Sequence, residues 1–202
     1  MIKIVLASKS IDRRKILHRL GIQFEVLKTN VDEETYKGKI SNPIELSMKL
    51  AELKATKANN LLKNKNDDYL IIAADTIVEC KGKIIGKAKS KDQAFEILKT
   101  LNNNTHYLIT GIAISQTRTT KIIRDHEITK VTFMTLSDYE IQTYIDFDEW
   151  QGRAGAYSIM DKASILIKKI NGSFSNIVGL PMNKVFQILK NDFDINILSL
   201  LK

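Results

Sequence analysis

The stretch KIVLASKSIDRRKIL, residues 3–17, decides the kind of fold that the chain is expected to adopt. Lys3 to Ala7 is an apolar run typical of a buried strand, and Ser10 is a suitable N-cap for a following helix. Leu17 and Leu20 would lie on one face of that helix, and Gly21 would end it. A strand joined to a helix by a short polar turn is the repeating unit of α/β proteins, so this stretch predicts an α/β fold.

The rest of the chain continues the alternation of strands and helices. Apolar and β-branched runs predict strands at residues 22–27, 69–79, 83–85, 105–116, 120–135 and 165–170. Helix-start signals at Asn42, Ser90 and Ser137 predict three helices, and a last helix carries Val185 and Leu189. Together with the long antiparallel hairpin, this order predicts a mixed, twisted sheet flanked by helices on both sides. Without a repeat or linker, residues 1–202 are expected to form a single domain.

Composition limits the classes of protein to which the chain can belong. With 202 residues, of which 44% are apolar, it can bury a core, and this excludes a disordered protein. The longest apolar runs, residues 2–7 and 70–74, are too short to span a bilayer, and no charged and then apolar leader is found. A soluble, cytoplasmic protein is expected. Cys80 is the single cysteine, so an internal disulfide and a cysteine-based metal cage are excluded.

The charge balance favours an anionic partner without naming it. The net charge is +8 and the isoelectric point is near 9.4. Nucleic acid, a nucleotide and acidic lipid would all fit that charge. Many of the 31 basic residues belong to polar runs such as residues 62–66, which are typical of solvated faces, so charge alone decides nothing.

Short polar islands stand where apolar runs end. They comprise Ala7–Ser10 with Arg13 and Arg14, Ala74–Thr76, Gly86–Lys87, and Gly152–Tyr157. In open α/β sheets, ligands bind at the ends of strands and the starts of helices, because backbone N–H groups and short side chains converge there. The islands therefore predict one site assembled from distant pieces of the chain.

The residue types in and around these islands indicate a phosphate ligand with a metal ion. The cations are Arg13, Arg14, Lys54 and Lys87, and the acids are Glu33 and Asp75. A hard divalent ion takes a few carboxylate oxygens and completes its shell with water and phosphate. A nucleoside triphosphate with Mg²⁺ fits this combination, and the helix after Ser10 would add its N-terminal amides.

Each of these residues also has a purely structural interpretation. Arg13 and Arg14 taken as an isolated pair favour a solvated helix face, Lys54 could extend from its helix to solvent, and Gly86–Lys87 could be only a turn. Asp75 is different, since a carboxylate directly after a buried apolar run costs desolvation unless it is paired or metal-bound.

Other sites are excluded or weakly indicated. Residues 82–87 are one residue short of a P-loop, and no G-x-S-x-G signature is present. The histidines, His18, His106 and His126, lack metal-ligand spacing and are interpreted as structural or surface residues. Residues 152–155 match the G-x-x-G loop of KH domains, which is a weak signal for nucleic-acid binding.

Taken in order, the islands resemble the Maf family of nucleoside triphosphate pyrophosphatases over almost the whole chain. The matching positions are Leu6–Ser8 with Ser10 and Arg13, Asp32–Glu33, Leu50–Ala51 with Lys54–Ala55, Ala74–Val78, Gly86–Lys87, Thr110–Gly111, Ala154–Tyr157, and Gly172–Ser173 with Asn176, Val178 and Gly179–Pro181. The resemblance implies two lobes around a deep cleft, dependence on Mg²⁺ or Mn²⁺, frequent homodimers, and hydrolysis of a nucleoside triphosphate to monophosphate and pyrophosphate.

The resemblance also assigns roles by matching position. Asp75 would be the proton acceptor or metal-linked activator of water, and Glu33 would assist at the metal. The phosphates would be bound by Ser8, Arg13, Lys54 and Lys87. Positioned cations suit this reaction, because attack at the α-phosphorus builds negative charge on the surrounding oxygens.

Three positions that the resemblance links to choice of base are Asp12, Thr76 and Met160. The family pattern after Ser10 is usually Pro-Arg-Arg, whereas this chain has Ile11-Asp12-Arg13. Thr76 agrees with the pyrimidine-preferring branch, but Asp12 and Met160 agree neither with it nor with the 7-methyl-GTP branch. An acidic group near the base would favour N–H donors, so the base preference is expected to differ from that of dTTP/UTP enzymes.

Three functions follow from the sequence. The leading one is a pyrophosphatase that clears non-standard or excess nucleotides. The second is a nucleotide-binding regulator of cell division that does not turn its ligand over. The third is a basic nucleic-acid-binding protein, which would leave Glu33 and Asp75 unexplained.

Overall fold

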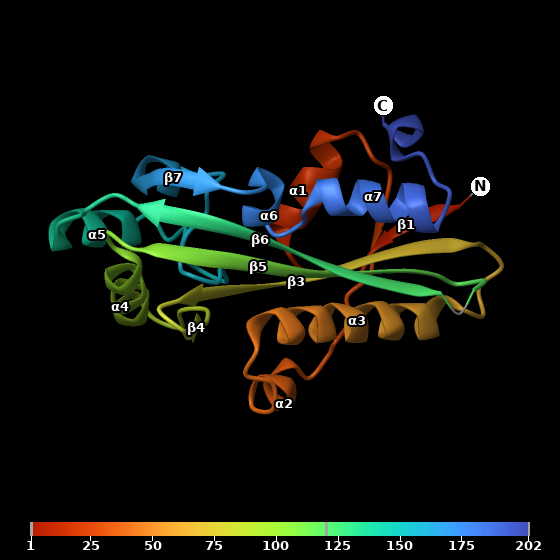
Figure 1. Ribbon diagram of the computed structural model, residues 1–202, viewed down its shortest axis with the longest axis horizontal. Helices are drawn as coiled ribbons and strands as arrows, with labels where there is room; N and C mark the ends of the chain where they lie inside the picture. The colour runs from red at the N-terminus through yellow and green to blue at the C-terminus, as the bar shows by residue number, and fades with distance from the viewer. Residues whose placement is uncertain (1, 120, 202) are drawn as a thin grey trace. The chain divides into compact units, whose positions relative to one another are not determined.

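The computed structural model, which describes residues 2–119 and 121–201, confirms a mixed α/β fold with helices flanking the sheet (Figure 1). The strands are β1 (Lys3–Leu6), β2 (Glu25–Val26), β3 (Tyr69–Cys80), β4 (Lys83–Ile85), β5 (Thr105–Gln116), β6 (Ile122–Phe133) and β7 (Ile167–Asn171). They form a seven-stranded sheet in the order β2-β1-β3-β5-β6-β7, with β4 paired to β3. β1 pairs with β2 and β3 in parallel, whereas the β3–β4 and β6–β7 pairs are antiparallel.

The helices begin close to the predicted N-caps. They are α1 (Ile11–Arg19), α2 (Glu33–Lys37), α3 (Pro43–Leu62), α4 (Lys91–Leu101), α5 (Asp138–Ile145), α6 (Phe174–Ile177) and α7 (Met182–Asp192), with 3-10 turns η1 (Lys162–Leu166) and η2 (Ile197–Leu200). Ser137 and Glu140 form the expected capping box of α5. Ser90 caps α4, but the Gln93 side chain accepts from the backbone N–H of Lys89 rather than closing a box with Ser90. No helix within the described part of the chain is long and apolar enough to cross a membrane.

The chain forms two compact units, which are considered separately. Unit 1 consists of Met1–Asp75, Thr110–Glu127 and Gly179–Lys202. Unit 2 consists of Thr76–Ile109 and Ile128–Val178. Strands β3, β5 and β6 each contribute residues to both units.

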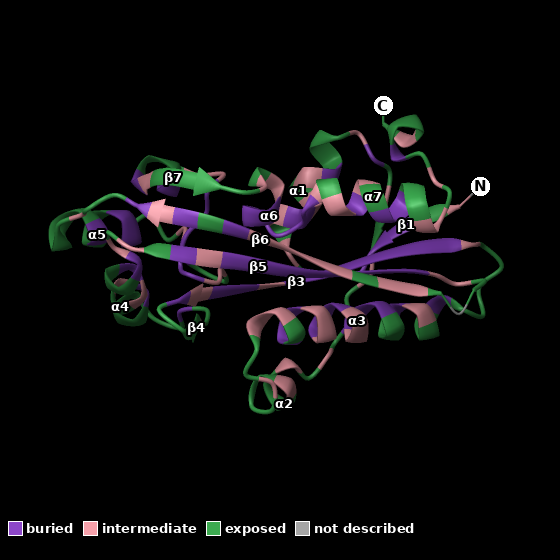
Figure 2. Cartoon of the chain, in the orientation of Figure 1, coloured by how far each residue is buried: buried purple, intermediate pink, exposed green. Residues whose placement is uncertain are grey.

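Unit 1 buries both faces of its part of the sheet, and β3 is buried along most of its length (Figure 2). Side chains alternate between the two faces of a strand. Leu70, Ile72 and Ala74 belong to a core with residues of α1 and α7, whereas Ile71 and Ala73 belong to a second core with the alanines of α3. The next residue on the α3 face of β3 is Asp75, so the alternation alone turns its carboxylate toward α3.

Helix α3 lies very close to β5 in unit 1. Gly111 has no side chain, and a Cβ built on it would come within 2.3 Å of the Ser47 backbone. The residues of α3 buried against the sheet include Ala51, Ala55 and Ala58. These small residues allow the backbones to approach, and Lys54 lies on the same buried face.

Asp75 follows the apolar run of residues 70–74 but lies inside β3, which matches the strand predicted over residues 69–79 and continues to Cys80. The strand that ends near Asp75 is β1, whose pairing with β3 stops at Leu6 and Ile72. The segment between β2 and α3, for which the sequence predicts no helix, contains α2, with Asp32 as its N-cap.

Candidate active site

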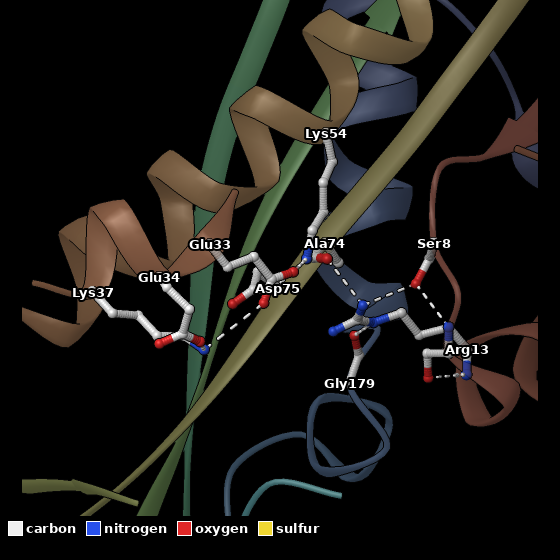
Figure 3. Close-up of polar contacts among 10 residues, drawn as sticks. Ser8, Arg13, Glu33, Glu34, Lys37, Lys54, Ala74, Asp75 and Gly179 are labelled. Atoms are coloured by element: carbon white, nitrogen blue, oxygen red, sulfur yellow. Dashed lines mark hydrogen bonds and ion pairs between the residues drawn. The ribbon is translucent and has the colours of Figure 1, made fainter. Parts of the chain in front are cut away.

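Arg13 is a buried cation on the first turns of α1. The alternative that Arg13 belongs to a solvated helix face does not hold, because Arg13 is only 8% exposed. Its Nε donates to the Gly179 carbonyl at 2.6 Å. Its Nη1 donates to Ser8 Oγ at 3.0 Å and to the Ala74 carbonyl at 2.9 Å (Figure 3). These bonds explain how a guanidinium can be buried, since each polar hydrogen needs an acceptor once water is removed.

Three acceptors of Arg13 come from segments that are far apart in the sequence. Ser8 follows the end of β1 and Gly179 precedes α7. Ala74 lies on β3 beyond its last β1 partner, Ile72, so its carbonyl is open to the arginine. These three acceptors are neutral groups, and they orient the guanidinium.

Arg13 lies in an acidic electrostatic environment despite its burial. Burial lowers the pKa of its guanidinium, while the charges of Asp75, Glu33 and Asp12 oppose that shift. An arginine pKa is so far above neutrality that the side chain stays protonated. The cation is therefore fixed, oriented and close to carboxylates.

Lys54 joins two carboxylates that come from different elements. Its Nζ lies 2.5 Å from Asp75 Oδ1 and 2.8 Å from Glu33 Oε1. The side chains of Lys54 and Asp75 are 11% and 13% exposed, and that of Glu33 is 34% exposed. Asp75 comes from β3, Lys54 from α3 and Glu33 from the first turn of α2 (Figure 3). Lys37 adds a fourth charge, with Nζ 3.9 Å from Glu33 Oε2.

The Glu33–Asp75 pair fits a divalent cation. The ammonium of Lys54 already lies between their oxygens, so both carboxylates are turned toward one position that holds positive charge. Oxygen ligands of this kind suit Mg²⁺ and Mn²⁺. Among residues 2–119 and 121–201, no group of three or more His, Cys, Asp or Glu is placed to hold a metal. Two carboxylates would thus leave most of the coordination shell to water and substrate oxygens.

The structure places the other predicted site residues on α1, on β3 and in unit 2. Asp12 is half-buried in the first turn of α1. Thr76 follows Asp75 on β3 and belongs to unit 2, as do Lys87 and the half-buried Met160. Lys87 is exposed, and its side chain has no ion pair within the described parts of the chain. Its backbone forms an antiparallel bridge with Ala154, and Gly155 N donates to the Gly86 carbonyl at 3.3 Å.

Sequence reasoning missed two contributors to the unit 1 cluster. Gly179 supplies a carbonyl to Arg13, and its φ of 98° is a backbone conformation suited to glycine. Lys37 lies one helical turn after Glu33, on a helix too short to show a periodic pattern. The i, i+4 spacing of Glu33 and Lys37 was a usable signal once that helix was known.

Comparison with known proteins gives the family of the chain. The family model described as Maf-like protein matches residues 3–192. The chain belongs to the Maf-like family. A Maf-like relative from Thermoanaerobacter sp. (strain X514), named dTTP/UTP pyrophosphatase, is 42% identical over 97% of this chain and 100% of its own length. Relatives with the same name from Alkaliphilus oremlandii (strain OhILAs) and Clostridium perfringens (strain SM101 / Type A) are 44% and 36% identical, over 98% and 97% of this chain and 100% of their own lengths. The resemblance seen in the sequence is confirmed.

Proposed function

We propose that the protein hydrolyses a nucleoside triphosphate to a nucleoside monophosphate and pyrophosphate, with Mg²⁺ or Mn²⁺ as cofactor. The observation that carries the proposal is the cluster in unit 1, where Lys54 lies between Glu33 and Asp75 beside the buried Arg13. The names of the Maf-like relatives support the same reaction class. Clearing non-standard or excess nucleotides would be its cellular use.

Each residue of the cluster has a task in this reaction. Arg13, oriented by Ser8 and two carbonyls, would bind a phosphate oxygen with a fixed positive charge. Lys54 offsets one of the two negative charges of Glu33 and Asp75, and an arriving polyphosphate offers its ammonium a further acceptor. Lys87 of unit 2 is proposed as another phosphate ligand, which its exposed side chain supports.

Asp75 is the proposed acceptor of the proton from the attacking water. A general base must be held in place near its water, and Asp75 is held by the strand it lies on and by Lys54. Glu33 and Asp75 would hold the divalent ion, which when bound supplies positive charge to the phosphate oxygens. The fixed cations stabilise the negative charge that grows on the leaving pyrophosphate.

The preference of the protein for one nucleobase is tested by comparing its activity on different nucleoside triphosphates. The names of the relatives make dTTP and UTP the reference substrates. Asp12, Thr76 and Met160 are proposed to contact or shape the base site, and Asp12 is expected to shift preference toward bases that present N–H donors. In a nucleotide panel, Asp12→Arg should raise kcat/KM for dTTP and UTP relative to the other triphosphates, by about tenfold for one good hydrogen-bonded contact. Equal or better turnover of dTTP and UTP by the unchanged protein would contradict this expectation.

The reaction itself is tested by measuring pyrophosphate release with Mg²⁺ or Mn²⁺ and identifying the nucleotide product. Asp75→Asn should lower kcat by about 10²- to 10⁴-fold, because the amide cannot accept a proton from water. Asp67→Asn makes the same chemical change at a half-exposed carboxylate paired with Lys3 and serves as the control. An unchanged rate in Asp75→Asn would refute the assignment of the base.

The same experiment separates the proposed enzyme from the two other functions. Nucleotide binding with Mn²⁺ but without hydrolysis would select a regulator. Nucleic-acid binding that weakens steeply with salt, without nucleotide turnover, would select a nucleic-acid-binding protein. A homodimer and a cytoplasmic location are further proposals from the family resemblance, and light scattering and cell fractionation test them.

A further inference from the structure

Unit 2 contains a buried imidazole–phenol pair that the proposed reaction does not use. His106 of β5 is fully buried, and its Nε2 lies 2.9 Å from Tyr157 Oη. Tyr157 is 5% exposed. The ring of Phe133 packs edge-on against both, with centroid distances of 5.1 Å to His106 and 5.0 Å to Tyr157. The single hydrogen bond therefore sits inside an aromatic core.

Stability does not explain why this core contains polar groups. Burial lowers the pKa of His106 to about 4, so its ring is neutral near pH 7, and burial also raises the pKa of Tyr157. Nδ1 of His106 is buried and has no hydrogen-bond partner among the described residues. A buried polar atom without a partner costs free energy, and two apolar side chains of similar shape would avoid that cost.

Tyr157 anchors a loop whose backbone is held in uncommon conformations. Gly155 and Ala156 have φ values of 75° and 59°. A positive φ is unfavourable for alanine and persists only when surrounding contacts impose it. The Tyr157 ring lies against Gly155, with Cε1 3.3 Å from the position that a Cβ would occupy. The hydrogen bond to His106 thus fixes the ring that presses on this turn.

The anchored loop is also the backbone partner of Lys87. Ala154 forms the antiparallel bridge with Lys87, and Gly155 N donates to the Gly86 carbonyl. Lys87 has an exposed side chain and no ion pair that would fix it within the described parts of the chain. The placement of its Cα, and hence the reach of its ammonium, depends on residues 154–157.

We propose that His106 is a positioning residue: through Tyr157 it fixes residues 154–157, and through their pairing with Gly86 and Lys87 it sets the position of the Lys87 ammonium. This inference rests on the proposed role of Lys87 as a phosphate ligand. Its consequence is that His106, without touching substrate, lowers the KM for the nucleoside triphosphate.

The test is a mutant cycle read by KM, kcat and Tm. The double variant His106→Leu with Tyr157→Phe removes the hydrogen bond and leaves no polar atom behind. It should raise KM for dTTP by about fivefold, with a smaller change in kcat and no loss of Tm. His106→Gln places an amide where Nε2 reaches Tyr157 and should keep KM within about twofold. His126→Gln, at a half-buried histidine of unit 1, is the matched control and should leave all three values unchanged.

Combination with Lys87→Met locates the effect. Lys87→Met alone should raise KM by about tenfold, as expected for loss of a charged hydrogen bond. Adding the His106 and Tyr157 changes to Lys87→Met should raise KM no further, because the contact that they position is already gone. Multiplied effects would show that His106 acts elsewhere and would overturn the inference.

The remaining outcomes separate the inference from the proposed function. If Lys87→Met raises KM but the double variant does not, the inference is overturned and the role of Lys87 stands. If Lys87→Met leaves KM unchanged, Lys87 is not a phosphate ligand, and the inference is overturned as well. Should the double variant fail to fold, Tyr157→Phe alone, which keeps the ring, decides in the same way: an unchanged KM overturns the inference.

Discussion

At the scale of single residues, adjacent positions of one helix separate into different environments. Arg13 is buried and bonded to Ser8, Ala74 and Gly179, whereas Arg14 is only half-buried. Successive residues of a helix point about 100° apart, so one of the two had to face away from the core. The sequence predicts a cation at this position but not whether its side chain is buried, because the carbonyls of Ala74 and Gly179 that bind it come from distant segments.

Lys54 is the residue whose removal should affect stability and activity together. Lys54→Met leaves Asp75 and Glu33 without the cation that they share, and both carboxylates are wholly or partly buried. Breaking a buried pair leaves an uncompensated charge, so we expect the free energy of unfolding at pH 7 to fall by about 3 kcal/mol. Because Lys54 is proposed to bind phosphate, its loss should also lower kcat/KM by about 100-fold. Urea denaturation and pyrophosphate release measure the two effects.

The control for that change is another lysine of α3. Lys49 pairs with Glu52 at 3.1 Å, with its side chain 38% exposed. An exposed pair contributes little, so Lys49→Met should change stability by less than about 1 kcal/mol and leave activity intact. Equal losses in the Lys49 and Lys54 variants would indicate a general effect of helix α3 and not of the buried cluster.

At the scale of elements, close packing of α3 on β5 brings Lys54 to Asp75. The alternation along β3 turns Asp75 to the α3 face, and small residues on α3 and at Gly111 bring the two elements together. Gly111→Ala should therefore force α3 away from β5, since its Cβ would lie 2.3 Å from the Ser47 backbone. We expect a loss of about 1–3 kcal/mol in the free energy of unfolding, typical of overpacking, together with lower activity.

Gly38→Ala provides the matched control for that prediction. Gly38 ends α2 with a φ of −75°, and a Cβ there would lie 3.8 Å from the Glu34 carbonyl oxygen, an ordinary contact. Its replacement should be neutral or slightly stabilising, because alanine restricts the unfolded chain. Equal stability of the Gly111 and Gly38 variants in urea denaturation would show that the α3–β5 contact relaxes without cost.

The elements differ in how far local sequence determines them. Strand β5 and the start of α3 carry strong local signals, a long β-branched run and an Asn-Pro cap, and both lie where the sequence predicts them. Helix α2 has only five residues, too few for a periodic pattern, so it was not predicted. The sequence indicates Glu33, Lys54 and Asp75 as candidates, but their contact depends on packing among three elements that no local pattern encodes.

At the scale of the whole molecule, the buried imidazole couples folding stability to pH. The pKa of His106 is lowered by burial from 6.5 to about 4. Between these two pH values the unfolded chain binds a proton at this histidine that the folded chain does not. Its contribution to stability is therefore complete above pH 6.5 and is lost as the pH falls toward 4.

Comparison of the unchanged protein with His106→Gln isolates this effect from all other titrating groups. Lowering the pH from 7 to 5 should reduce the free energy of unfolding of the unchanged protein by about 2 kcal/mol more than that of the variant, since glutamine does not titrate. Urea denaturation at the two pH values measures the difference. Because His106→Gln keeps a hydrogen bond to Tyr157 within reach, the two proteins should differ little at pH 7. Parallel losses in both proteins would mean that the folded protein protonates His106 as readily as the unfolded chain does, which would contradict this prediction.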